Sequence, residues 1–295
     1  MKIKFWGVRG SIPSPGPKTV RYGGNTTCIE VRTDAGELII IDAGTGIAAL
    51  SQNLLNELPV KASVFITHTH WDHIHGLPFF LPFFMPGNKI KLHGAFDMIT
   101  GHGIQQIMEV QMQYSYFPIR EAELRAAIEY RTLEVAETVT VGDATVKPAL
   151  LNHPVTDYGY RVTCNGKSMF FTGDHEPWYN IYEAGTSGYA EFQAMIDDKQ
   201  RVMDDAIRDV DVLIVDCSYT TEEYPAKKGW GHGTFAAAIA LARRTGAKKL
   251  VCTHHEPTRS DDELERVFAE VLEQHPRQES DPEIVLSYEG LEISL

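Results

Sequence analysis

The chain has 295 residues, of which 43% are hydrophobic and 23% are charged, and its formal net charge is −13. This composition is typical of a soluble globular protein, and the length suffices for one large domain or two fused halves. Because an acidic surface repels polyanions, the charge argues against a long RNA or DNA substrate, although a local basic patch would still permit one.

The cysteines and the apolar runs bear on the compartment of the protein. The four cysteines lie far apart and form no Cys-x-x-Cys pair, so we expect neither a disulfide framework nor a cysteine zinc site. The N-terminus lacks the apolar core of a signal peptide, and no apolar run approaches the length of a membrane span. We therefore expect a cytoplasmic protein without a membrane partner.

The N-terminal part of the chain is predicted to alternate strands and loops. Residues 2–6 alternate polar and apolar side chains like a first strand, and residues 28–32 and 38–41 predict a hairpin. A helix is expected over residues 47–58. The apolar run 62–66 then predicts a buried strand that leads directly into a polar loop.

That loop contains three histidines and one aspartate within six residues: His68, His70, Asp72 and His73. In extended backbone the side chains of His68 and His70 point the same way and can bind one ion, while Asp72 and His73 can serve a second. Imidazole and carboxylate together suit zinc first, then manganese or iron. The alternative of ordinary surface histidines explains so dense a cluster poorly.

Further polar residues follow predicted strands downstream. A hairpin over 139–151 ends at His153, and a second hairpin over 158–172, with an Asn-Gly turn, ends at Asp174. A buried strand over 210–215 ends at Asp216, and another over 249–252 ends just before His254. Helices are expected over most of 178–209, over 235–244 and from the capping box at Ser260 to about residue 275, before two last strands within 283–295.

Two segments allow more than one interpretation. The stretch 77–86 carries four phenylalanines, which either belong to the core or line the mouth of the site. Residues 95–130, in which 121–130 looks helical, have no place in the strand count. We interpret this segment as an insertion that covers or shapes the substrate pocket.

The pattern His-x-His-x-Asp-His at 68–73, followed by His153, by Asp174 in a Gly-Asp step and by His254, resembles the signature of the metallo-β-lactamase superfamily. The resemblance covers essentially the whole chain. It implies an α+β fold, a four-layer αββα sandwich built as a single domain over 1–295, with the site at one edge between two similar halves.

The resemblance also implies the roles of the clustered residues. His68, His70 and His153 would hold a first metal, whereas Asp72, His73 and His254 would hold a second. Asp174 would bridge the two ions. Behind the site, Asp42 would orient a ligand histidine. Five further histidines are not expected to be ligands, although His175 and His255 adjoin ligands and can support the site: His75, His93, His102, His175 and His255.

The step Gly-His-Gly-Thr at 231–234 resembles the ribonuclease Z and phosphodiesterase branch of the superfamily. This implies that His232, paired with Asp216, protonates a leaving oxygen; the alternative is a simple loop residue. Segments 6–11, 22–26 and 229–232 are similar to a bacterial group of hydrolases near the cyclic-nucleotide phosphodiesterases. Arg9, Lys227 and Lys228 are candidates for phosphate contact, although solvated surface charge is the commoner role.

Together these resemblances imply an enzyme with two divalent ions, zinc first and manganese or iron next. The expected reaction is hydrolysis of a small phosphodiester, such as a cyclic nucleotide, by a metal-bridging hydroxide. His232, Asp216 and Asp72 are the expected catalytic residues. A ribonuclease-Z-like RNA nuclease, a thioester or lactone hydrolase, and a metal-holding sensor with weak turnover remain alternatives, and a homodimer remains open.

Overall fold

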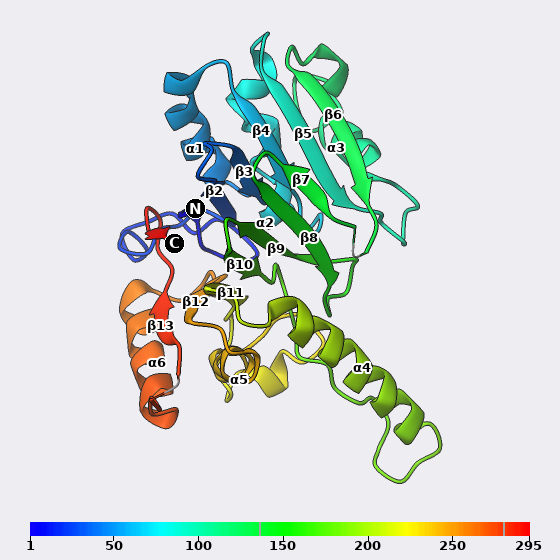
Figure 1. The fold of residues 1–295 in the computed structure, drawn as a ribbon, viewed down its shortest axis with the longest axis vertical. Helices are drawn as coiled ribbons and strands as arrows, with labels where there is room; N and C mark the ends of the chain where they lie inside the picture. The colour runs from blue at the N-terminus through cyan, green and yellow to red at the C-terminus, as the bar shows by residue number, and fades with distance from the viewer. Residues whose placement is uncertain (136, 280) are drawn as a thin grey trace.

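Two seven-stranded β-sheets form the centre of the computed structural model, which describes residues 1–135, 137–279 and 281–295 (Figure 1). The strand order is β14-β1-β2-β3-β4-β5-β6 in the first sheet and β13-β12-β11-β10-β9-β8-β7 in the second. The first sheet contains β1 (Lys2–Gly7), β2 (Cys28–Arg32), β3 (Leu38–Ile41), β4 (Lys61–Phe65), β5 (Lys89–Ala95), β6 (Ala127–Leu133) and β14 (Glu292–Ser294). The second contains β7 (Val139–Val141), β8 (Ala144–Leu150), β9 (Tyr158–Cys164), β10 (Lys167–Phe171), β11 (Val212–Asp216), β12 (Lys249–Thr253) and β13 (Glu283–Leu286).

Helices cover the outer faces of both sheets (Figure 1). They are α1 (Gly46–Leu54), α2 (Trp71–Ile74), α3 (Ile104–Gln111), α4 (Tyr189–Ile207), α5 (Phe235–Thr245) and α6 (Asp261–Gln274). One cluster of buried apolar side chains joins the two sheets, and two further clusters join each sheet to its helices. Helix, sheet, sheet and helix therefore form four layers, which confirms the expected αββα sandwich.

Strand direction brings the polar loops to one edge of the sandwich. In the first sheet β3, β4, β5 and β6 are parallel, and in the second β10, β11, β12 and β13 are parallel. Since β8 and β10 each pair antiparallel with β9, they run in the same direction as each other. The carboxyl ends of parallel strands meet at one edge of a sheet, where ligands commonly bind. The loops after β8, β10, β11 and β12 therefore gather there.

Two predicted elements were wrong in type or extent. The segment 121–130 is not a helix, because Ala127–Leu133 forms β6 and pairs with β5 over its whole length. Its side chains alternate in exposure, as on an edge strand. Helix α4 begins only at Tyr189, after glycines at 185 and 188 that adopt a positive φ.

Part of the phenylalanine-rich segment lies in the core, and whether its exposed part lines the mouth of the site stays a prediction. Phe80 and Phe83 are fully buried in the core under the first sheet's helices, whereas Phe79 is mostly exposed and stacks edge-on against Phe117. Whether residues 95–130 cover the substrate pocket stays a prediction. Among the residues that the structure describes, no helix is both long enough and apolar enough to traverse a bilayer.

Candidate metal centre

Three histidines from two loops form the first half of a polar cluster. His68 and His70 come from the loop after β4, and His153 comes from the loop after β8. His70 Nδ1 lies 3.1 Å from His68 Nε2 and 3.0 Å from His153 Nε2. A single ring hydrogen cannot serve two neighbours at once, so these three nitrogens are better matched by a shared cation than by hydrogen bonds.

Four residues form the second half of the cluster. His73 Nε2 lies 3.3 Å from Asp72 Oδ2 and 3.2 Å from Asp174 Oδ1. His254 Nε2 lies 3.1 Å from each of the same two oxygens. Asp174 directs its other oxygen to the first half, 3.6 Å from His68 Nε2. The aspartate thus lies between the two groups, where a bridging ligand would lie.

The hydrogen bonds of the histidines leave one ring nitrogen free for the cluster. His73 Nδ1 lies 2.7 Å from Asp42 Oδ2, and His153 Nδ1 donates to the Gly231 carbonyl at 2.9 Å. These contacts place the proton on Nδ1 and direct the Nε2 lone pair inward, as in metal sites. Asp42 is completely buried and also accepts from the Thr67 amide at 2.8 Å. It occupies the supporting position that the family resemblance implies.

Burial keeps two of the histidines in the form that binds metals. Removal from water lowers the pKa of His68 well below its ordinary value and lowers that of His153 to about 4. Neutral imidazole is the ligand form. In addition, His73 Nε2 and Asp174 Oδ1 are buried atoms without a hydrogen-bond partner among the described residues. The seven residues therefore offer ligand atoms suited to divalent cations, which this fold implies.

His232 lies beside this cluster and pairs with Asp216. Its Nδ1 donates to Asp216 Oδ2 at 2.9 Å, and its ring stacks on His254 with 4.9 Å between centroids. Burial lowers the pKa of His232, but the charges of Asp216 and Asp174 outweigh this effect and raise it to about 9. The two carboxylates therefore favour the protonated ring.

A cavity of about 480 Å³ opens beside the cluster. Trp71 stands at this cavity with 81% of its surface exposed, and the Ser11 amide donates to Asp72 Oδ2 at 2.7 Å. No residue of 95–130 lines this cavity among those described. Its lining residues are Ser11, Thr69, His70, Trp71, Asp72, Asp174 and His232.

Three supporting carboxylate and hydroxyl groups were missed in the sequence. Asp157 is fully buried, 3.3 Å from His68 Nδ1. Ser218 Oγ lies 2.7 Å from Asp216 Oδ1 and 3.0 Å from His254 Nδ1, and so links the two residues. Glu176 accepts hydrogen bonds from the amides of the loop before His232. The only signals were the positions of Ser218 and Glu176 two residues after Asp216 and Asp174.

Glu176 fixes the loop that carries His232. Its carboxylate accepts from the Gly229 amide at 2.8 Å, the Gly231 amide at 2.9 Å and the Tyr224 hydroxyl at 2.7 Å. Gly231 has a φ of 88°, and a Cβ there would lie 2.3 Å from His153 Nδ1. Only glycine fits a backbone that packs this closely on a histidine ring.

The expected phosphate contact of Arg9 is wrong. Its side chain is fully buried, forms an ion pair with Asp261 at 3.1 Å and donates to the Gly23 and Arg259 carbonyls. All of these partners are structural, so no guanidinium group is left for a substrate. Lys227 and Lys228 lie over aromatic rings, 4.2 Å from Trp230 and 3.9 Å from Tyr179 respectively, and remain candidates.

The other histidines lie outside the cluster. His175 Nδ1 accepts from the Asn152 amide at 3.2 Å, and His255 Nε2 donates to the Ser287 carbonyl at 2.9 Å. His93 is buried against Phe65. The exposed His75 and His102 belong to none of the groups in which the described residues bring ligand atoms together.

The family model described as "Beta-lactamase superfamily domain" matches residues 38–255, and the chain belongs to this family. Together with the fold, this makes the protein a metal-dependent hydrolase of the metallo-β-lactamase superfamily, as the motifs predicted.

Individual relatives are more distant. Ribonuclease Z of Staphylococcus aureus is 22% identical over 302 residues, which cover 92% of this chain and 94% of the relative. The metallo-β-lactamase-fold protein YhfI from Bacillus subtilis has a TM-score of 0.68 at 17% identity, with 99% of this chain and 98% of that chain covered. A diphosphatase from the PhnP family has a TM-score of 0.63 at 18% identity, with 100% and 97% covered. At these identities the structural likeness establishes the fold.

Proposed function

We propose that the protein is a two-metal phosphodiesterase that hydrolyses a small phosphodiester, such as a cyclic nucleotide. The observation that carries the proposal is the pair of His232 and Asp216, which adjoins a cluster of seven potential metal ligands. A proton donor beside such a cluster suits a reaction with a poor leaving group, such as an alkoxide. The ribonuclease and diphosphatase names of two of the similar proteins support phosphoryl chemistry.

The proposed ligands divide into two sets that share one residue. His68, His70 and His153 would bind one divalent ion, Asp72, His73 and His254 a second, and Asp174 both. Zinc suits these donors best, with manganese or iron next. Bound divalent ions would supply Lewis acidity and would activate water as the nucleophile at neutral pH. Asp72 is thus assigned as a ligand and catalytic residue.

The protein's own residues would handle the leaving group. Asp216 holds the Nδ1–H of His232, so Nε2 is the ring atom that remains to deliver a proton to the leaving oxygen. The cavity beside the cluster, lined by His232 and His70, receives the phosphate. When Nε2 has given its proton, Asp216 stabilises the correct tautomer for the next cycle.

An RNA nuclease is the second candidate, because the curated relatives are ribonucleases Z. The net charge of −13 weighs against a long nucleic acid. A steep loss of activity with salt would favour the nuclease, since release of counterions accompanies binding of many phosphates.

The experiment compares substrates on one preparation of the protein loaded with zinc or manganese. Bis(p-nitrophenyl) phosphate, a 3′,5′-cyclic nucleotide, a single-stranded RNA, a thioester and a lactone are assayed in parallel. Turnover of the small diesters is the expected result, and His232→Ala should lose most of it with the cyclic nucleotide, whose leaving group is an alkoxide. Turnover of only the thioester or lactone would contradict the proposal, and turnover of none with both metals bound would favour a metal-holding sensor.

A cytoplasmic location and a homodimer stay predictions. Fractionation of cells that express the tagged full chain tests the first, and light scattering of the purified protein tests the second. A membrane-bound or secreted protein would contradict the location.

A further inference from the structure

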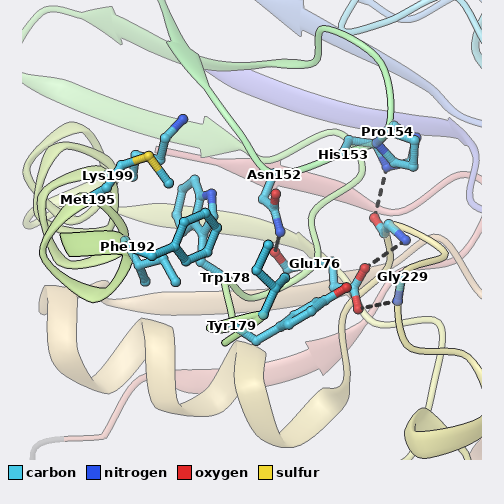
Figure 2. A pocket seen from close by; sticks show the side chains of 13 residues that line it. Asn152, His153, Pro154, Glu176, Trp178, Tyr179, Phe192, Met195, Lys199 and Gly229 are labelled. Atoms are coloured by element: carbon cyan, nitrogen blue, oxygen red, sulfur yellow. Dashed lines mark hydrogen bonds between the residues drawn. The ribbon is translucent and has the colours of Figure 1, made fainter. Parts of the chain in front are cut away.

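A second cavity, of about 300 Å³, is lined in part by His153, whose Nε2 belongs to the metal cluster (Figure 2). It is lined by the loop after β8, the loop after β10, helix α4 and the loop before His232. Figure 2 shows Phe192, Met195 and Lys199 on one side of it and His153 with Glu176 on the other. Neither the proposed ligand set nor the proton donor accounts for this cavity.

One wall of the cavity is aromatic and apolar. Trp178 and Tyr179 come from the loop after β10, and Phe192, Met195 and Lys199 come from α4. The three α4 residues are spaced three and four apart, so they lie on one face of the helix. Aromatic side chains around a small cavity are typical of sites that bind flat rings by stacking.

This face of α4 is only partly covered within the described part of the chain, where the Tyr182 ring packs edge-on against Phe192 with 5.5 Å between centroids. The end of α4 that begins at Tyr189 projects away from both sheets (Figure 1), and its buried residues are Ile196, Met203 and Ile207. Met195, on the cavity side, is 43% exposed. A helix that leaves apolar side chains exposed beside a cavity is suited to cover a ligand there.

The cavity also contains polar groups that are not used elsewhere. Lys199 forms no ion pair within the described residues. Asn152 donates one amide hydrogen to the Glu176 carbonyl at 2.9 Å, and its Oδ1 has no partner in the part of the chain described. A cation and a carbonyl oxygen together match the carbonyl and N–H edge of a nucleobase.

The cavity adjoins the metal cluster through His153. This ring presents Nε2 to the cluster and donates from Nδ1 to Gly231, and both residues line the cavity. A group attached to a phosphate at the cluster thus needs to pass only one side chain to enter the cavity. The volume lies at the lower end for small-molecule sites, so it takes one ring system rather than a run of nucleotides.

We propose that this cavity binds the base of a nucleoside that is joined to the scissile phosphate. The base stacks on the aromatic wall, with Lys199 and Asn152 at its polar edge. The inference rests on the proposed phosphodiesterase function, and it assigns α4 as the element that selects nucleoside diesters over simpler ones.

The test compares two diesters with the same leaving group. Methyl p-nitrophenyl phosphate and the p-nitrophenyl ester of thymidine 5′-phosphate are assayed with the zinc-loaded full chain. Phe192→Ala and Lys199→Met are the test variants. Val202→Ala is the matched control, because Val202 lies on α4, is exposed and does not line the cavity. Melting temperatures verify that each variant is folded.

We expect the wild-type protein to prefer the thymidine ester. Phe192→Ala should raise KM for that ester about tenfold, in keeping with the loss of one stacked base, while KM for the methyl ester stays unchanged. Lys199→Met should have a smaller effect of the same kind. Equal effects on both esters, or none, would overturn the inference and leave the phosphodiesterase proposal intact.

A binding measurement separates failure of the inference from failure of the proposed function. If neither ester is hydrolysed, the proposed phosphodiesterase function fails. Calorimetry with thymidine 5′-phosphate then tests separately whether the cavity binds a nucleobase. Binding to the wild type that weakens about tenfold in Phe192→Ala and not in Val202→Ala would support the cavity assignment. Equal affinity in all three proteins, or no binding to any, would overturn it.

Discussion

At the scale of single residues, His232 separates metal binding from proton transfer. Its contact to Asp216 is short, its ring lies against His254 and it lines the cavity. It also brings a ring nitrogen within 4.8 Å of ligand atoms of Asp174, Asp216 and His254, so metal content has to be measured beside turnover. A residue in this position is expected to affect turnover much more than metal affinity.

His232→Ala should retain both metals and lose about a hundredfold to ten-thousandfold in kcat, the usual contribution of general acid catalysis. Metal content by mass spectrometry and turnover of a 3′,5′-cyclic nucleotide check this, because its alkoxide leaving group needs a proton whereas p-nitrophenolate does not. Asp216→Asn should lose less, since the imidazole remains. If His232→Ala binds fewer ions than the wild type, the residue is a ligand and not an acid.

Glu176→Gln should destabilise the protein. The carboxylate of Glu176 accepts three hydrogen bonds at a buried position. In the variant, the side-chain NH₂ group of glutamine replaces one of the two acceptor oxygens, so it would face a backbone N–H or a hydroxyl that also donates. The free energy of unfolding should fall by about 1–3 kcal/mol. Urea unfolding measures it, with the exposed Glu222→Gln as the control that should show no change.

His93 should make stability sensitive to acid. Burial lowers the pKa of His93 to about 4, below the ordinary 6.5 of the unfolded chain. Between these pH values the unfolded chain takes up a proton that the folded protein excludes. Stability from this group is therefore present above pH 6.5 and falls toward pH 4, at a rate approaching about 1.4 kcal/mol per pH unit.

Unfolding in urea at pH 7 and pH 5 tests this point. His93→Gln removes the titrating ring, so the variant should lose less stability between the two pH values than the wild type does. His102→Gln, at an exposed histidine, should behave as the wild type. Identical pH dependence in all three proteins would show that His93 is not the group responsible.

Site residues could be predicted from the sequence where their spacing along the chain, or their position at the end of a strand, indicates a shared location. The two histidines of His-x-His share one face of an extended segment, and strand ends announced Asp174 and His254. Asp157 gave no such signal and Glu176 gave only its position two residues after Asp174, because their partners come from loops that are remote in the sequence. Arg9 misled for the same reason: a lone arginine in a loop does not announce a buried partner at Asp261.

At the scale of elements, the predictions succeeded where a run is apolar on both faces. β10 and β11 are buried along nearly their whole length, and the sequence shows this as continuous apolar runs. The prediction for β6 was wrong because an edge strand exposes one face, and the resulting mixture of polar and apolar residues also suits a helix. The start of α4 was predicted too early because residues 178–188 contain no periodic pattern that distinguishes a loop from a helix.

Arg9 of the N-terminal loop and Asp261 of α6 form a buried ion pair, so Arg9→Met should destabilise the protein. Asp261 would remain buried at the start of α6 without its cation. A broken pair of this kind costs about 3–5 kcal/mol. Thermal or urea unfolding measures the loss, and the double variant Arg9→Met/Asp261→Asn should recover part of it. Full stability of the single variant would contradict the role assigned to the pair.

At the scale of the whole molecule, the sandwich brings loops of both sheets to one edge. The loop after β4 belongs to the first sheet, whereas His153, Asp174 and His254 belong to the second. Neither half contains the full set of seven residues. The account therefore requires that both groups of side chains bind cations in the folded protein and that Asp174 serves both.

The most direct test counts bound metal per chain. The purified protein is stripped with a chelator, reloaded with zinc or manganese and measured by mass spectrometry, beside His153→Ala and His73→Ala, one from each group of ligand atoms. The account predicts two ions per wild-type chain and a reduced count in each variant. A wild-type protein that binds no ion after reloading would contradict it.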